Sequence, residues 1–326
     1  MAKLRGVDAK LTRLAALRKE PTSGDSVALL SQLLSDASNL VVAEAAAVVG
    51  EQVVKGLAGD LVAAFERLMI DPEESDKQCR AKIAIVEALN AIEYGEPDVF
   101  LRGLTHVQNS RPPLWTQDAA GPLRAHCALA LARIGHPGLI NRLAERLLDS
   151  DHAARTGFVR ALSGTGSTGA VPLLRYKTLL GDESSDVMGE CFASLLSLQP
   201  DESVSFVGRF LAARDETVQS AAVFALAETR RPEAFTLLEQ FWPRASDEVK
   251  ESVLIGMAMF RIPAAFDFLI ALVAQKDPAA RSAITALAIH RHNSKIKDRV
   301  AAAVTANGNA AVRQWFEKKF ADGARA

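Results

Sequence analysis

The chain has 326 residues, of which 49% are hydrophobic and 6% are aromatic. That apolar content excludes a disordered chain, and the many runs of Ala, Leu and Val favour closely packed helices. The 38 basic and 39 acidic residues give a formal charge of -1, so the chain as a whole has no electrostatic field that would attract nucleic acid or an anionic membrane.

The N-terminal residues 1–8 include basic side chains, but no apolar run follows them, so we expect no signal peptide. No stretch approaches the ~20 apolar residues that a membrane-spanning helix needs. The cysteines Cys79, Cys127 and Cys191 lie far apart within helical patterns and form no CxxC pair, which favours reduced, buried thiols over disulfides or a zinc site. These features predict a cytoplasmic protein without membrane contact.

Paired amphipathic helices are predicted first over residues 40–53 and 60–69, and then over residues 77–92 and 98–107. The segment 94–121 then delays the next helix pair. Because residues 109–121 contain a Pro-Pro pair and a flanking Gly, we expect a loop of about a dozen residues there. Trp115 beside Arg111 is a candidate contact pair in this loop. Alternatively, Trp115 packs back into the gap between neighbouring repeats.

From residue 122 onward the sequence repeats itself at intervals close to 31 residues. Equivalent anchor positions are Arg124, Arg155, Gly189, Gln219, Lys250, Arg281 and Arg313.

Apolar residues recur three and seven positions after each anchor, a spacing that marks one buried face of a helix. Prolines recur thirteen positions after several anchors, and because proline is tolerated in the first turn of a helix, a second helix should begin there. The examples are Pro137, Pro232 and Pro263. Each unit is therefore predicted to be a helix hairpin.

The motif Asp-x-x-x-Arg followed by Ala-Leu, clearest in residues 151–162 and 277–287, resembles the HEAT-repeat family in its short bacterial form, similar to the phycobilin-lyase-type HEAT-like repeats. The resemblance covers roughly residues 25–320. It implies an armadillo-type, all-α fold: a right-handed α-solenoid, or superhelix, of about nine HEAT-like helix hairpins. Residues 1–326 would form this single solenoid, with 94–121 inserted as a loop between repeats. It also implies a ladder of Asp and Arg side chains between repeats, weakened at Gly189 and Gln219.

If the anchor helices line the concave side, as the resemblance implies, the positions two, five and nine residues after each anchor face the groove. Few of them are charged, which argues against nucleic acid. Phe224, Ile255 and Met259 form an apolar strip that suits an amphipathic helix or an extended peptide. Alternatively, tight curvature or a terminal helix covers the strip. The groove positions are His126, Leu129, Arg133, Gly157, Arg160, Gly164, Cys191, Ser194, Leu198, Ala221, Phe224, Glu228, Ser252, Ile255, Met259, Ala283, Ala286 and His290.

Catalytic and cofactor motifs are missing from the sequence. There is no His-Glu dipeptide of the kind that a deoxyhypusine-hydroxylase-type iron site needs, and the six histidines lack HExxH spacing. The sequence contains no GxxxxGK[ST] or GxSxG motif, and residues 164–169, which have GxGxxG spacing, are interpreted as a turn before a helix. A HEAT-type DNA glycosylase would need a basic channel with aromatic residues around a base. We therefore expect no enzyme activity, no metal and no cofactor.

The sequence thus favours a non-catalytic scaffold or adaptor that binds another protein, as a helix or an extended peptide, in its concave groove. The alternative is a HEAT-type bilin lyase-like or ligand-carrying protein, and a HEAT-type DNA glycosylase is the less favoured third hypothesis. No nucleic acid partner is expected. The hypothesised partner-binding residues are Phe224, Ile255, Met259, His290, Arg160, Arg111 and Trp115.

Overall fold

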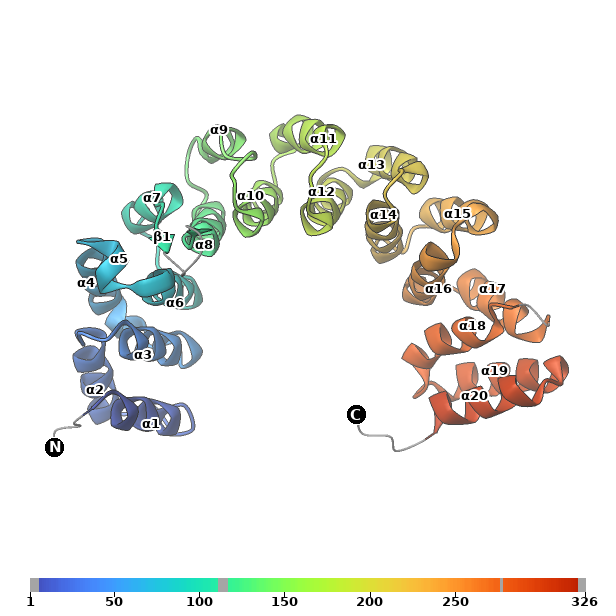
Figure 1. Cartoon of the computed structure of the whole chain (residues 1–326), viewed down its shortest axis with the longest axis horizontal. Coiled ribbons are helices and arrows are strands. Elements are labelled where there is room, and N and C mark those ends of the chain that lie inside the picture. Colours follow the sequence, from blue (N-terminus) through green and yellow to red (C-terminus); the bar gives the residue numbers. More distant parts are fainter. Residues whose placement is uncertain (1–5, 111–116, 276–277, 322–326) are drawn as a thin grey trace. The chain divides into compact units, whose positions relative to one another are not determined.

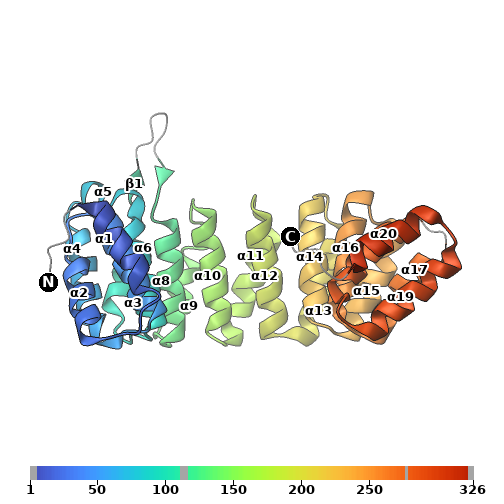
Figure 2. The ribbon, with the colours of Figure 1, turned by 90° about the horizontal axis from the view of Figure 1, so that it is seen from below.

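The computed structural model describes residues 6–110, 117–275 and 278–321. Within these ranges the protein is all-α apart from one short β-ribbon, and its helices stack as an α-solenoid of hairpins (Figures 1 and 2). The chain divides into two compact units, Met1–Leu173 and Leu174–Ala326. Each unit is described by itself, and a single solenoid over residues 1–326 stays a prediction.

Unit 1 consists of two layers of helices (Figure 1). One layer contains α1, α3, α6, α8 and α10, which pack against one another in that order, and the other contains α2, α4, α7 and α9. The elements are α1 (Val7–Leu17), α2 (Gly24–Leu34), α3 (Asn39–Glu51), η1 (Lys55–Leu57), α4 (Ala58–Leu68), α5 (Pro72–Ser75), η2 (Lys77–Cys79), α6 (Arg80–Ala91), α7 (Asp98–Thr105), β1 (Asn109–Ser110), β2 (Gln117–Asp118), α8 (Gly121–Arg133), α9 (Leu139–Ala144), α10 (His152–Gly164) and η3 (Thr168–Ala170).

Unit 2 repeats this two-layer arrangement. Its first layer contains α12, α14, α16, α18 and α20, which pack in that order, and α13, α15, α17 and α19 form its second layer. The helix α11 (Val171–Leu180) spans the boundary between the units. The other elements are α12 (Ser185–Leu198), α13 (Pro200–Gly208), η4 (Arg209–Ala212), α14 (Glu216–Glu228), α15 (Pro232–Phe241), η5 (Trp242–Arg244), α16 (Asp247–Phe260), α17 (Pro263–Ala274), α18 (Ala280–Leu287), η6 (Ala288–His290), α19 (Ser294–Asn307) and α20 (Ala310–Phe320).

The helix ends follow local chemistry. The side chains of Asp151 and Ser246 accept hydrogen bonds from the free backbone N–H groups in the first turns of α10 and α16. Pro232 and Pro263 stand at the first positions of α15 and α17, which confirms the predicted starts of these second helices. Pro137 instead lies in the turn before α9, because Gly138 takes a left-handed conformation and α9 begins only after it.

The predicted apolar face forms the core. Every residue seven positions after an anchor is buried, from Leu131 in α8 to Phe320 in α20. Three positions after the anchors the side chains are also buried, except that Phe316 is only half-buried. The first-layer helices approach closely: a Cβ atom at Gly157 would lie 2.6 Å from the Cα atom of Ala125. Glycine is therefore required at this contact between α8 and α10, because backbone atoms cannot move aside as a side chain can.

The segment 94–121 contains more structure than a plain loop. Helix α7 occupies its first part, as the predicted helix 98–107 requires, and β1 then pairs antiparallel with β2, with Asn109 opposite Asp118. Arg111 and Trp115, the predicted contact pair, lie outside the described residues. Asp118 of β2 accepts hydrogen bonds from the backbone N–H groups of Gln108, which precedes β1, and of Ala120, which precedes α8. These bonds tie the two ends of the ribbon together at the start of α8.

An Asp and Arg ladder is present in unit 1, but its carboxylates are Asp118 and Asp149, six positions before Arg124 and Arg155, whereas the predicted Asp151 caps α10. Arg124 is 2% exposed, and its guanidinium donates two hydrogen bonds to Asp149, at 2.7 and 3.0 Å, and one to Asp118 at 2.6 Å. It also donates to the carbonyl oxygen of His106 at 2.9 Å. Burial lowers the pKa of Arg124, but the hydrogen bonds to Asp149 and Asp118 outweigh burial and raise the pKa above its ordinary value. This one side chain thus connects the β-ribbon, α8 and the turn before α10.

A second buried ion pair was not predicted. Lys82 and Asp76 are both fully buried, with Nζ and Oδ2 separated by 3.1 Å. Asp76 also accepts hydrogen bonds from the backbone N–H groups of Ala81 and Lys82, and Gln108 donates to the Asp76 carbonyl oxygen. A fully buried pair is tolerated only when its remaining hydrogen-bonding positions are used in this way.

The ladder is weaker in unit 2. Gln219 donates only to the carbonyl oxygen of Ala213, as expected for a weak anchor. Lys250 pairs with Asp247 in its own helix, so it joins no neighbouring repeat through this contact. Arg281 lies over the Trp315 ring, and its predicted partner Asp277 lies outside the described residues. Unit 2 also contains a buried ion pair, Lys177 with Asp182 at 2.7 Å, which links α11 to the turn before α12.

The three cysteines are free and buried, as predicted. Burial raises the pKa of the Cys79 thiol to about 12, and burial raises that of Cys191 to about 12 as well. Both therefore remain protonated, unreactive thiols near neutral pH.

Candidate functional site

The first-layer helices of unit 2 are held in a defined register by side-chain hydrogen bonds. Ser252 of α16 donates from its Oγ to the Oγ of Ser220 in α14, at 3.0 Å. Trp315 of α20 donates from Nε1 to the Oγ1 of Thr285 in α18, also at 3.0 Å. Because such bonds fix which turns lie opposite each other, the exposed residues of neighbouring helices can be aligned without ambiguity.

An apolar strip runs across the solvent-facing side of these first-layer helices. Phe224 and Ile255 each lie about one turn beyond the Ser220–Ser252 hydrogen bond, so they are neighbours. Phe224 and Met259 are half-buried, Ile255 is 38% exposed, and Ile289, at the matching position after α18, is 52% exposed. We refer to Phe224, Ile255, Met259 and Ile289 as the apolar strip. Three of its four residues were predicted from the sequence.

Ile289 was missed, and several predicted groove positions are buried instead. Cys191 and Ser194 in α12, and Ala283 and Ala286 in α18, lie in the core. In both helices the positions that face solvent are shifted by one residue, to the half-buried Ala193 and the exposed Ser197 in α12 and to the exposed Thr285 and Ile289 in α18. Gly157 is also buried, since it faces α8. The prediction was wrong in α12 and α18 because the anchors Gly189 and Arg281 were placed one residue too late in these two helices.

His290 lies beside the strip rather than on it. Its Nε2 donates to the carbonyl oxygen of Ala258 at 2.9 Å, since a carbonyl oxygen can only accept. Its ring contacts the Phe266 ring edge-on, with the centroids 5.1 Å apart. The half-buried imidazole therefore joins the end of α18 to α16 and α17. Arg160 is exposed on α10 in unit 1.

Three arginines follow the strip at one border, and sequence analysis did not single them out. Arg230, Arg261 and Arg291 come directly after the last turns of α14, α16 and η6, and all three are exposed. Each stands six residues after a position on the face, namely Phe224, Ile255 and Thr285. We refer to Arg230, Arg261 and Arg291 as the arginine row. Cations at helix C-termini are favourable because the helix dipole is negative there.

The other end of the face is an aromatic and cationic cluster. The Trp315 ring of α20 has Arg281 at 4.4 Å from its centroid, Lys319 at 5.2 Å and Lys318 at 5.3 Å. Such cation–π contacts hold the half-buried indole against α18. Trp315 therefore closes the face on the side of the last helix.

The second layer of unit 2 has a cleft of about 620 Å³ between α13 and α15. Arg231 pairs with Asp201 across it, with 2.6 Å between nitrogen and oxygen, and an adjoining hollow has Phe206 between the guanidinium groups of Arg175 and Arg209. The cleft lining is charged: Asp201 and Glu233 supply carboxylates, and Arg231 supplies the guanidinium that pairs with Asp201.

Groups of at least three His, Cys, Asp or Glu side chains that could hold a metal ion do not occur among the described residues. In the same part of the chain, no helix combines the length and the apolar character needed to cross a bilayer.

Several solved structures are similar to this chain. One is human deoxyhypusine hydroxylase in complex with glycerol, at 23% identity over 78% of this chain and 91% of that one, with a TM-score of 0.31. Another is an engineered protein, at 18% identity over 98% of both chains, with a TM-score of 0.40. A third is the complex of CpcE and CpcF of phycocyanin lyase from Nostoc, at 17% identity over 89% of this chain and 95% of that one, with a TM-score of 0.37.

A search of curated proteins gave no match. The family model for HEAT repeats matches residues 114–195 and 204–290, which is more than half of the chain and includes most of the helices that carry the strip. The predicted repeat type is thus confirmed, and the chain belongs to the HEAT-repeat family.

Proposed function

We propose that the protein is a non-catalytic scaffold or adaptor, and that it binds a helix or an extended peptide of another protein on the apolar strip. The observation that carries this proposal is the strip itself. Four large apolar side chains, from three neighbouring helices, stand partly or largely in solvent on a rigid framework. Exposed apolar side chains scattered singly are ordinary, whereas a contiguous set mostly marks a binding surface.

The strip also matches what a helical or extended ligand needs. Neighbouring packed helices are separated by about 8–10 Å. A ligand lying across α14, α16 and α18 can therefore meet the strip with about every second turn of a helix, or with about every third residue of an extended chain. Its residues are aliphatic or aromatic, and Glu228 is the one carboxylate between Phe224 and Arg230. Arg160 and the Arg111–Trp115 pair remain proposed contacts elsewhere in the chain.

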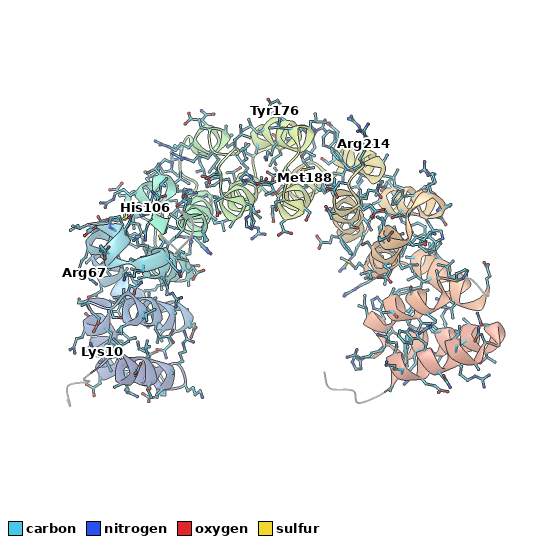
Figure 3. The ribbon with its side chains drawn as sticks, in the orientation of Figure 1. Lys10, Arg67, His106, Tyr176, Met188 and Arg214 are labelled. Carbon is cyan, nitrogen blue, oxygen red and sulfur yellow. The ribbon has the colours of Figure 1, made fainter. Side chains whose placement is uncertain are left out.

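Co-purification from the native cell tests the proposal. The strip variant replaces Phe224, Ile255 and Met259 with Ala, and circular dichroism checks that it keeps its helical content. The matched control replaces Tyr176, Leu179 and Leu180 of α11 with Ala. These side chains are 67%, 59% and 54% exposed. Tyr176 projects from α11 on the side away from α12 (Figure 3).

We expect a protein that the wild type retains to be recovered at about one tenth of its level or less with the strip variant, because the loss of a few central apolar contacts costs most of the binding energy. The control should retain it in full. Equal recovery with the folded strip variant, or a loss with the control alone, would contradict the proposal. Ile255→Glu supplies a second variant should the triple substitution unfold unit 2.

A further inference from the structure

The arginine row and the apolar strip repeat together. Position by position, Phe224, Ile255 and Thr285 form one line across α14, α16 and α18, and Arg230, Arg261 and Arg291 form a second line six residues later in the chain, in the turns after α14, α16 and η6. The hydrogen bond from Ser252 to Ser220 and that from His290 to Ala258 hold the helices in this register. The two lines therefore lie side by side on unit 2.

The guanidinium groups of the row have no carboxylate partner among the described residues, a property that they share with Arg214, Arg244 and Arg313 of unit 2. Arg231 pairs with Asp201 and Arg299 pairs with Asp267, whereas no ion pair is formed by Arg230, Arg261 or Arg291. Glu228 is the one carboxylate in the last turn of α14, so the border remains net positive. The helix C-termini attract these cations, but they leave the exposed side of each guanidinium free to bind another anion.

The opposite border is different. Glu248 and Glu251 are exposed in the first half of α16, about one to two turns before Ile255. At this end of α16 the two carboxylates stand beside Lys250 and the exposed Arg244, so the border carries both charges, whereas Arg261 is the charged residue directly after the other end of α16. A ligand that matches this pattern is apolar in the middle and carries its carboxylates on the side of the arginine row.

We propose that the occupant of this face is an acidic amphipathic protein segment, whose apolar side chains contact the apolar strip and whose Asp or Glu side chains pair with Arg230, Arg261 and Arg291. This inference rests on the proposed function and adds the chemistry of the partner. Helices packed about 8–10 Å apart set the spacing of the carboxylates. A helical partner rises 1.5 Å per residue and would place them about seven residues apart, and an extended one would place them about three residues apart.

A nucleic acid is less suited to the same surface. Its affinity depends on many phosphate contacts, and single strands also need aromatic side chains on which bases stack. The row supplies three cations, and two of the strip residues beside it are the aliphatic Ile255 and Ile289. A protein segment uses both features, since its apolar side desolvates the strip while its carboxylates meet the arginines.

Selection from a library of random 16-residue peptides, displayed on phage, tests the inference. Four forms of the full chain serve as bait: wild type, the row variant Arg230→Glu/Arg261→Glu/Arg291→Glu, a matched control Arg214→Glu/Arg244→Glu/Arg313→Glu, and the strip variant. The control arginines are exposed and stand before α14, in η5 before α16, and in the first turn of α20, so the control makes the same change of net charge elsewhere on unit 2.

We expect wild type and control to enrich the same peptides, with Asp or Glu at a fixed interval beside apolar residues. The row variant should enrich Lys or Arg there instead, and synthetic peptides from the wild-type selection should bind it roughly tenfold more weakly. Higher salt should weaken binding to the wild type more than binding to the row variant.

The outcomes separate the two proposals. Peptides that depend on the strip but show no acidic preference, or that bind the folded row variant as well as the wild type, would overturn this inference and leave the proposed function standing. No strip-dependent enrichment at all would overturn both. A fluorescein-labelled single-stranded DNA of 20 nucleotides that binds through the arginine row, with no peptide selected, would replace the acidic segment by a nucleic acid.

Discussion

Replacing Arg124 with Met should lower the free energy of unfolding of unit 1 by about 3–5 kcal/mol, because it removes one partner of a buried charge network. Arg124 is 2% exposed and is the only cation that bonds to both Asp118 and Asp149 in the described structure. Without it, two carboxylates lose their counter-ion where water has little access. The β-ribbon and the turn before α10 would also lose their common contact.

The measurement is hydrogen exchange of peptides from α8 and α10 at increasing urea concentration, since a repeat array need not unfold in one step. Arg142→Met is the matched control: Arg142 is exposed in α9, and its loss should change stability by no more than ~0.5 kcal/mol. Equal protection in Arg124→Met and wild type would show that the network does not stabilise unit 1.

The pH dependence gives a second readout of the same network. Burial raises the pKa of Asp118, but hydrogen bonds from Ala120, Gln108 and Arg124 outweigh it and lower the pKa below its ordinary value. A carboxylate with a lowered pKa in the folded state contributes stability above its unfolded pKa, and this contribution is lost as the pH falls through the folded pKa. In wild type, the hydrogen bond from Arg124 adds to the lowering of the Asp118 pKa. The Arg124→Met variant should therefore lose less stability on acidification than wild type.

Leu226→Ala should cost about 2–5 kcal/mol in unit 2, because Leu226 is fully buried in α14 and truncation leaves a cavity in a tightly packed layer. Ile255→Ala is the matched control on the next first-layer helix. Ile255 is 38% exposed, so its truncation should cost less than ~1 kcal/mol. Urea unfolding followed through peptides of α14 and α16 measures both. Similar losses for the two variants would mean that the buried and exposed faces of these helices are misassigned.

Much of the fold could be predicted because one physical pattern recurs along the chain. Leu162, Leu226 and Met257 occupy the same place in successive units, so a single helical period predicts the core face of each. Pro232 and Pro263 predict helix starts because proline is compatible with few other positions in a helical hairpin.

The candidate site was harder to predict, because it depends on helix rotation. Phe224, Ile255 and Met259 were found, but Ile289 was missed, since the step from α16 to α18 is one residue shorter than the average and moves every exposed position of α18. The arginine row was missed because its residues lie in the turns between helices, outside the helical period that marks a helix face. Lys82 was missed because a lysine in an amphipathic helix ordinarily faces solvent, and its buried partner Asp76 precedes its helix.

The most direct test of protein binding on the strip is photo-crosslinking in the native cell, with a benzophenone side chain introduced at position 255 in one variant and at position 176 in another. The benzophenone side chain replaces Ile255 in one variant and Tyr176 in the other, and Tyr176 is the more exposed of these two residues. Random collisions would therefore favour adducts at position 176. We predict a discrete protein adduct from position 255 and none from position 176. Adducts from position 176 alone, or from neither position, would contradict the account.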